Sequence, residues 1–174
     1  VFENRLTPAG LTCGKLTGTT ALLKAFADQT SVTNMIEWHY AIARFVNGSV
    51  PVYYYMEANM LQELILEEFR KLGQAKGDII PIKGDTRKKP DKFARIEALQ
   101  PLFEQHLVVF NQDERDSPGM QVLVEQLLAF ERGSRMHDDA PDALEGAIWM
   151  LNRRWGHNTD NIQSVFPKTS NRRY

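Results

Sequence analysis

The feature that most constrains the fold is a continuous apolar run at residues 50–56, Val-Pro-Val-Tyr-Tyr-Tyr-Met, followed directly by Glu57. β-Branched and aromatic residues without polar interruption are typical of a strand that is covered on both faces. Such strands occur mainly in α/β proteins, whose sheets carry helices on both sides. The run therefore predicts an α/β fold, and it places a carboxylate where a buried strand ends.

Extended and helical patterns alternate around this run. Short β-tolerant stretches predict an N-terminal hairpin, and apolar residues at helical spacing predict amphipathic helices. The expected strands are residues 12–16, 20–27, 50–56, 78–82 and 107–110; the expected helices are residues 34–45 (capped by Asn34), 61–72 (stopped by Gly73), 90–104, 117–130 and one after His137. Strands followed by alternating strand and helix predict a mixed central sheet with helices on both faces.

The length and composition favour one domain. A chain of 174 residues with 43% hydrophobic and 25% charged residues can bury one real core, expected here over residues 1–155. Residues 156–174 are polar and without periodicity, which predicts a flexible tail. The single cysteine, Cys13, excludes an internal disulfide framework and favours an intracellular protein. No apolar run approaches the roughly 18 residues of a membrane span, and no signal peptide is expected.

Acidic side chains at two places are candidates for chemistry. Glu57 follows the apolar run, where ligands bind in open α/β sheets, although it could equally favour the start of the next helix, with Asn59 as its cap. Asp138, Asp139 and Asp142 fall three or four residues apart at one helix end. A hard divalent cation commonly stabilises such mutually repelling carboxylates. Acidic residues at a helix N-terminus are also stabilising without metal, by roughly 0.3–1 kcal/mol each.

Basic residues crowd into residues 83–95. Lysine and arginine on one surface attract a phosphate backbone without reading its sequence, and that attraction weakens as salt rises. An ordinary solvated charge run is the alternative. The candidate DNA-binding residues are Lys83, Arg87, Lys88, Lys89, Lys92 and Arg95.

Three segments together resemble the C-terminal nuclease domain of phage terminase large subunits. They are Val-Tyr-Tyr-Tyr-Met-Glu-Ala-Asn at residues 52–59, Arg-Lys-Lys-Pro-Asp-Lys-Phe-Ala-Arg-Ile-Glu at residues 87–97, and His-Asp-Asp-Ala-Pro-Asp-Ala-Leu-Glu at residues 137–145. The likeness runs in order over residues 18–151, and the last motif is the most specific. It implies an RNase H-like fold and endonucleolytic cutting of concatemeric phage DNA into genome lengths.

The resemblance also implies roles for individual residues. Glu57, Asp138, Asp139 and Asp142 look like the catalytic acids, and Glu57, Asp139 and Asp142 like ligands of two divalent cations, Mg²⁺ or Mn²⁺, about 4 Å apart. Which aspartate bridges the ions stays open. His137 is either an accessory residue that positions water or phosphate, or a polar neighbour only.

One departure concerns the family's first strand, which normally carries an aspartate that completes the metal site. Glu3 is the only acidic residue among residues 1–20. Either the chain begins downstream of that aspartate, which its start at Val1 favours, or this copy has lost it. The site is therefore expected to be incomplete in this chain.

The resemblance implies partners as well as an activity. These are double-stranded DNA, the terminase ATPase domain that this chain lacks, the small subunit and the portal, in the cytoplasm of a bacterial host that carries a phage or prophage. Two alternatives stay open: a non-catalytic DNA-binding or docking module of the packaging motor, and another RNase H-like nuclease such as a resolvase.

Overall fold

The computed structural model describes residues 9–16, 19–46, 48, 51–57, 63–134 and 137–163. Strands and helices alternate along them, as expected for an α/β protein. In chain order the elements are β1 (Ala9–Leu16), β2 (Thr19–Ala27), α1 (Val32–Val46), β3 (Tyr55–Glu57), α2 (Glu63–Lys76), β4 (Lys83–Asp85), α3 (Lys92–Glu97), α4 (Gln100–Glu104), β5 (Val108–Phe110), the 3-10 helix η1 (Gln112–Glu114), α5 (Pro118–Leu128) and α6 (Asp139–Gln163).

The described strands form two sheets, whereas the sequence predicted one central sheet. In the larger sheet β2 is the middle strand, antiparallel to β1 and parallel to β5, so this sheet is mixed as predicted. The smaller sheet consists of β3 and β4, which run parallel and pair over three residues each. Because β3 hydrogen-bonds only to β4 among the described strands, the smaller sheet does not continue the larger one.

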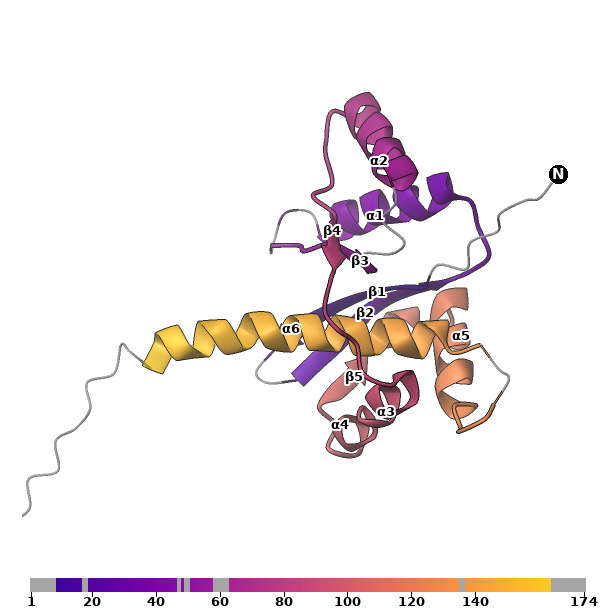
Figure 1. Ribbon diagram of the computed structural model, residues 1–174, viewed down its shortest axis with the longest axis vertical. Helices are drawn as coiled ribbons and strands as arrows, with labels where there is room; N and C mark the ends of the chain where they lie inside the picture. The colour runs from indigo at the N-terminus through magenta and orange to yellow at the C-terminus, as the bar shows by residue number, and fades with distance from the viewer. Residues whose placement is uncertain are drawn as a thin grey trace, which may run out of the picture.

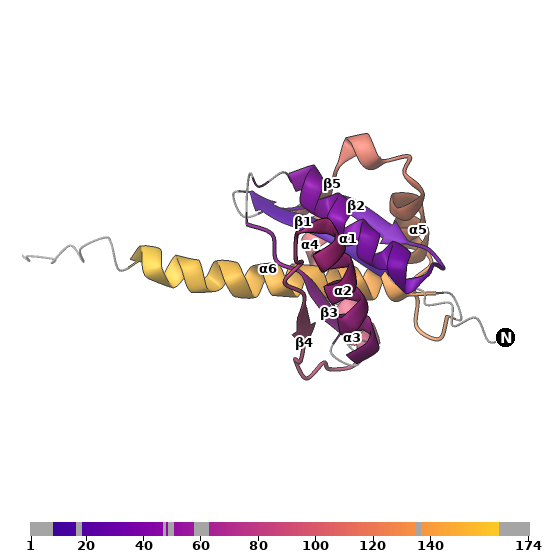
Figure 2. The same ribbon diagram turned by 90° about the horizontal axis from the view of Figure 1, so that it is seen from above.

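Helices lie on both sides of the β1–β2 hairpin (Figures 1 and 2). Helices α5 and α6 contact the hairpin from one side and enclose a core that includes Leu22, Leu123 and Leu144, all completely buried. On the other side α1 and α2 pack together around Ile36 and Phe69. Two cores thus flank the hairpin, and α6 runs along it and beyond the rest of the molecule (Figure 2).

The smaller sheet begins later than the sequence predicted. The apolar run forms a strand only at Tyr55–Glu57, and the predicted strand at residues 78–82 is replaced by β4, which begins directly after it at Lys83. Pro81 has no N–H to donate, so the ladder cannot pass through it in regular form. Pairing starts where Lys83 N–H donates to the Tyr54 carbonyl over 3.0 Å.

Two predicted ends of the first helices were wrong. The hydroxyl of Ser31, rather than the side chain of Asn34, accepts a backbone hydrogen bond at the start of α1, from the N–H of Asn34 over 3.2 Å. Helix α2 continues through Gly73 to Lys76, and Gly77 follows it with a φ of 67°. Only glycine adopts this left-handed conformation without strain, so Gly77 ends the helix.

Two further boundaries differ in the C-terminal half. The helix predicted at residues 90–104 is divided into α3 and α4, and Pro101 lies in the first turn of α4, where a missing N–H costs nothing. Helix α6 continues to Gln163, past the predicted domain boundary at residue 155. The rest of the predicted tail, residues 164–174, lies outside the described residues.

Candidate functional site

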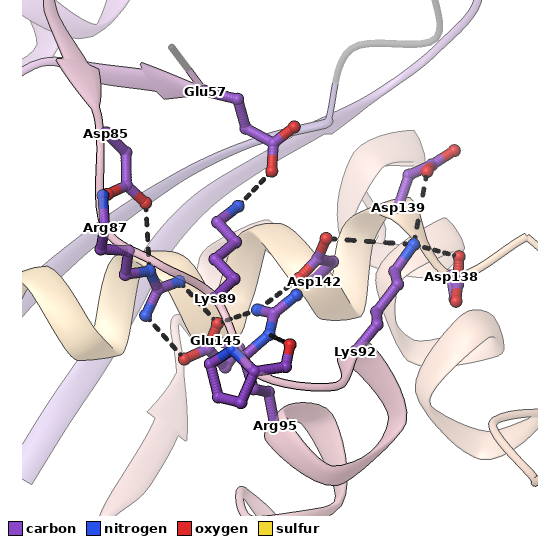
Figure 3. A network of polar contacts seen from close by, with 11 residues as sticks. Glu57, Asp85, Arg87, Lys89, Lys92, Arg95, Asp138, Asp139, Asp142 and Glu145 are labelled. Atoms are coloured by element: carbon purple, nitrogen blue, oxygen red, sulfur yellow. Dashed lines mark hydrogen bonds and ion pairs between the residues drawn. The ribbon is translucent and has the colours of Figure 1, made fainter. Parts of the chain in front are cut away.

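Four segments bring six carboxylates together beside α6 (Figure 3). Glu57 ends β3 and Asp85 ends the parallel strand β4, so the two are register partners at one edge of the small sheet. The segment that enters α6 and its first two turns supply the others, at three- and four-residue spacing that places them on one side of the helix. These are Asp138, Asp139, Asp142 and Glu145.

The buried centre of this group is Glu145. Arg87 donates from both terminal nitrogens to the two carboxylate oxygens of Glu145 over 2.9 and 2.7 Å, and Arg95 donates to one of the same oxygens. Arg87 also donates through Nε to Asp85 over 3.1 Å. The side chains of Arg87, Arg95 and Glu145 are 8%, 8% and 10% exposed. Two arginines thus fix the loop after β4 to α6 through one buried carboxylate.

Arg95 also approaches Asp142. Its Nη1 lies 2.8 Å from Asp142 Oδ1, yet that buried oxygen receives no hydrogen bond of good geometry from the described residues. Burial opposes protonation of the guanidinium, but the carboxylates of Asp142 and Glu145 outweigh burial and raise the pKa of Arg95 above its usual range. Arg95 is therefore a permanent cation, and Asp142 is one of its two carboxylate partners.

Three aspartates surround the ammonium group of Lys92. Its Nζ lies 2.6 Å from Asp138 Oδ1, 3.9 Å from Asp142 Oδ2 and 4.0 Å from Asp139 Oδ1 (Figure 3). These side chains are more accessible than the Glu145 group, since that of Lys92 is 39% exposed. One small cation thus stands where three carboxylates converge.

Lys89 is the counter-ion at the small sheet, where its ammonium group donates to the single carboxylate of Glu57. Taken together, the six carboxylates and four cations drawn in Figure 3 are called the ion-pair cluster here, and they carry a formal charge of −2; among the described residues no ion pair joins Lys89 and Glu57 to the other eight. Without Lys89 and Lys92 the formal charge would be −4, which two divalent cations would neutralise. The two lysines are the accessible counter-ions, and the two arginines are the buried ones.

The donor set of the cluster fits a hard divalent cation, since oxygen ligands are those that Mg²⁺ and Mn²⁺ prefer. The ammonium group of Lys92 stands in for such a cation among three aspartates, and Asp142 has a buried oxygen without a hydrogen bond. No three Asp, Glu, His or Cys side chains of the described residues are spaced to hold a metal ion. The metal-ligand roles expected from the sequence stay predictions.

Comparison with known proteins shows a likeness in structure. No protein-family model matches the sequence, and no curated protein matches it. A solved structure described as the human cytomegalovirus terminase nuclease domain superposes with a TM-score of 0.57 and 15% sequence identity, covering 86% of this chain and 79% of that one. The chain has a terminase nuclease-like fold. The terminase nuclease resemblance expected from the sequence is confirmed at that level.

The predicted DNA-binding residues divide into two groups. Arg87, Lys89, Lys92 and Arg95 all donate to carboxylates of the ion-pair cluster, which the sequence did not predict. Lys83 and Lys88 are exposed and form no ion pair with the described carboxylates. Contact with DNA stays a prediction for all six, and four of them are paired with carboxylates of the described residues.

His137 lies just before α6, on the surface. It lines a cavity of about 260 Å³ together with Phe93, Phe130 and Asp138. The cavity adjoins Lys92, so His137 is a neighbour of the cluster rather than a member of it. Its accessory role stays a prediction.

Two members of the cluster, Asp85 and Glu145, were not predicted as site residues. Glu145 did give a signal, because it interrupts the apolar stripe of Leu144 and Ile148 on α6 and lies one turn from Asp142. A carboxylate at the margin of a buried helix face needs a cation, and the sequence supplied several candidates. Asp85 gave no signal, since it ends a strand that begins only where the predicted one was expected to end. None of the described helices combines the length and the apolarity of a membrane span.

Proposed function

We propose that this chain is the metal-dependent endonuclease domain of a viral DNA-packaging terminase, which cuts concatemeric phage DNA into genome lengths. The observation that carries the proposal is that lysine ammonium groups hold the predicted acids, Lys89 at Glu57 and Lys92 at Asp138, Asp139 and Asp142, within a terminase nuclease-like fold. Carboxylates collected around accessible, displaceable cations are suited to exchange those cations for metal.

Glu57, Asp139 and Asp142 would hold two divalent cations, Mg²⁺ or Mn²⁺, with Asp138 beside them. Such ions, when bound, activate a water and stabilise the leaving oxygen of a phosphodiester. Lys89 and Lys92 hold the carboxylates together until then, and they become available to phosphate oxygens when released. Arg87, Arg95 and Glu145 act as positioning residues, because they keep α6 beside the loop that carries both lysines.

The wider setting is proposed on the same basis. The substrate is double-stranded DNA, and the partners are the terminase ATPase domain, the small subunit and the portal, in the cytoplasm of a bacterium that carries the phage or prophage. The RNase H-like fold and the phage origin are supported by the three sequence segments. The solved neighbour, whose description names a human virus, supports the terminase nuclease-like fold.

A second function is favoured by one observation, the pairing of every predicted metal ligand with a cation of the same chain. A domain that had lost catalysis could keep these pairs as permanent structure and serve as a DNA-binding or docking module of the packaging motor. The two functions differ in whether metal can replace the lysines.

Plasmid nicking tests the proposal. The chain is incubated with supercoiled plasmid in Mn²⁺, Mg²⁺ or chelator, beside the variants Glu57→Gln and Asp142→Asn and the control Asp116→Asn, an exposed aspartate outside the cluster. Thermal melting establishes that each variant is folded. We expect nicking in metal only, slow because no aspartate lies among residues 1–20, lost in both cluster variants and kept in the control.

The other outcomes assign the chain elsewhere. DNA binding without nicking in either metal would establish the non-catalytic module. Cleavage of branched junctions in preference to linear duplex would identify a resolvase-like nuclease. Full nicking by Glu57→Gln would remove that residue from the site.

A further inference from the structure

The face of α6 that carries Asp142 continues toward the C-terminus with a different chemistry. Trp149 follows Asp142 by seven residues and Arg153 by eleven, which are about two and about three helical turns. All three therefore lie along one stripe of the helix. Arg153 is about 16 Å from Asp142 along the helix axis.

Arg153 on this stripe and Arg154, the next residue of α6, both contact aromatic rings. The guanidinium of Arg153 lies 5.3 Å from the ring centre of Trp149, and that of Arg154 lies 3.6 Å from the ring centre of Tyr53. Arg154 also donates through Nε to the hydroxyl of Tyr55 over 3.1 Å. Neither arginine forms an ion pair with a carboxylate of the described residues.

The small sheet adds a third cation to this group. Lys83 is the register partner of Tyr55 in the parallel ladder, and neighbouring strands are about 4.8 Å apart. Lys83 is exposed and, within the described part of the chain, unpaired with any carboxylate. Tyr53 is 56% exposed, so an aromatic ring faces solvent beside the three cations.

We propose that this group, the arginine–aromatic surface, binds the sugar–phosphate backbone of duplex DNA beside the cut. It consists of Tyr53, Tyr55, Lys83, Trp149, Arg153 and Arg154. The inference rests on the proposed nuclease function for the position of the cut, but contact with DNA at this surface does not depend on cleavage.

Charge complementarity selects the backbone as the ligand. Three uncompensated cations on one surface match a polyanion, and binding of phosphates by lysine and arginine needs no base contact. Aromatic rings hold a guanidinium in place through cation–π attraction while leaving its N–H groups free to donate. The aromatic rings therefore fix the positions of the guanidinium groups, and the cations attract the DNA backbone whatever its base sequence.

The distance between Asp142 and Arg153 along α6 predicts how far from the cut the surface contacts the DNA. About 16 Å corresponds to about five base pairs at 3.4 Å per step. A duplex whose scissile phosphate lies at Asp142 and which follows the helix axis meets Arg153 about half a helical turn away. The surface would set the direction in which DNA leaves the site.

The experiment measures binding without cleavage. Fluorescence anisotropy of a labelled 30-base-pair duplex is recorded in chelator at several salt concentrations, for the chain and for Arg153→Ala, Tyr53→Ala and Lys83→Ala. Arg70→Ala on α2, which removes an exposed arginine elsewhere, is the matched control. Arg154→Lys keeps the charge but loses the hydrogen-bonded fork to Tyr55.

We expect Arg153→Ala and Lys83→Ala each to weaken binding several-fold and to reduce the slope of log affinity against log salt by about 0.9, the value for one lost phosphate contact. Tyr53→Ala and Arg154→Lys should weaken binding with the slope unchanged. Arg70→Ala should leave both quantities unchanged, and scrambling the duplex sequence should have no effect.

Two results would overturn the surface. One is affinity and salt slope unchanged in Arg153→Ala and Lys83→Ala, and the other is no binding by the unaltered chain. If these variants lose DNA binding and the unaltered chain never nicks plasmid in metal, the DNA-binding role of the surface is supported and the nuclease function is rejected. If the unaltered chain nicks plasmid in metal and the variants bind DNA as it does, the nuclease function is supported and the DNA-binding role of the surface is rejected.

Discussion

In the first turns of α6, Asp142 and Glu145 face arginines that are buried beside them, whereas three turns later Arg153 and Arg154 of the same helix lie over aromatic rings. At the first place each positive charge is cancelled by a carboxylate. At the second it is held in position but left uncancelled. The density of basic residues in a segment therefore does not locate a nucleic-acid surface. The partners of those residues in the fold decide which positive charges are left to attract phosphate.

Burial explains why the two regions differ. A charge removed from water needs a paired, hydrogen-bonded counter-charge, as Arg87 and Arg95 have in Glu145. Arg153 is exposed, so it needs no counter-ion, and a nearby ring attracts it by only about 0.5–1 kcal/mol. The first region should therefore respond strongly in stability when disturbed, and the second mainly in DNA binding.

The largest effect on this comparison should come from Glu145→Ala. Removing the shared carboxylate leaves Arg87 and Arg95 buried without their main partner, and breaking a buried pair from one side costs about 3–5 kcal/mol. Urea denaturation measures the free energy of unfolding. Glu97→Ala, an exposed glutamate on α3, is the control and should change it by less than about 0.5 kcal/mol. A loss below about 1 kcal/mol in Glu145→Ala would contradict the description of the cluster as buried structure.

The next effect should be metal-linked stability. A ligand that binds only the native state stabilises it by about 2.7 kcal/mol at one hundred times its dissociation constant. Replacing Lys89 and Lys92 together by methionine removes the two competing ammonium groups, so Mn²⁺ should raise the melting temperature at lower concentration than in the unaltered chain. Lys88→Met, which removes an exposed lysine of the same loop, should behave as the unaltered chain does. Equal Mn²⁺ responses in all three proteins would show that the lysines do not compete with metal.

A smaller effect is expected when Lys92 alone is replaced by alanine in chelator. Its side chain and that of Asp138 are 39% and 37% exposed, so solvent screens their attraction, and such pairs contribute about 0.2–1 kcal/mol. The unfolding free energy should fall by no more than about 1 kcal/mol, far less than in Glu145→Ala. A loss as large as that of Glu145→Ala would place Lys92 among the structural cations rather than the displaceable ones.

The smallest effect concerns pH and belongs to neither region. Burial lowers the pKa of His39 below its ordinary 6.5, against the opposing effect of its 2.8 Å contact with the Met35 carbonyl. Because the unfolded chain then binds the proton more readily, the contribution of neutral His39 is complete above pH 6.5 and is lost as the pH falls below it. His39→Gln should flatten the decline of unfolding free energy just below pH 6.5, as measured by urea titrations across pH. An unchanged decline would assign the acid sensitivity to other groups.

The sequence predicted those elements whose signals are local. The hairpin, α1, β5 and α5 follow from apolar spacing or β-branched runs within a single segment. The placement of β4 could not be predicted, because its register is set by a hydrogen bond between Lys83 and Tyr54, from different parts of the chain. The break between α3 and α4 had a local signal in Pro101, which the periodic pattern around it concealed.

The candidate site was predicted in part for the same reason. The spacing of Asp138, Asp139 and Asp142 and the strand end at Glu57 are local features, and the structure brings a lysine to each place. The pairing of Arg87 with Glu145 joins residues 58 positions apart, and no local pattern could assign it. The arginine–aromatic surface likewise joins α6 to β3 over 99 positions, through Arg154 and Tyr55.

The most direct test of the central claim, that the cluster exchanges lysine for metal, is anomalous diffraction from crystals of the chain grown with Mn²⁺. We expect anomalous density at the carboxylates of Asp139, Asp142 and Glu57, with the ammonium groups of Lys89 and Lys92 displaced from them. Both lysines still on their carboxylates at saturating Mn²⁺, with no anomalous density among them, would contradict it.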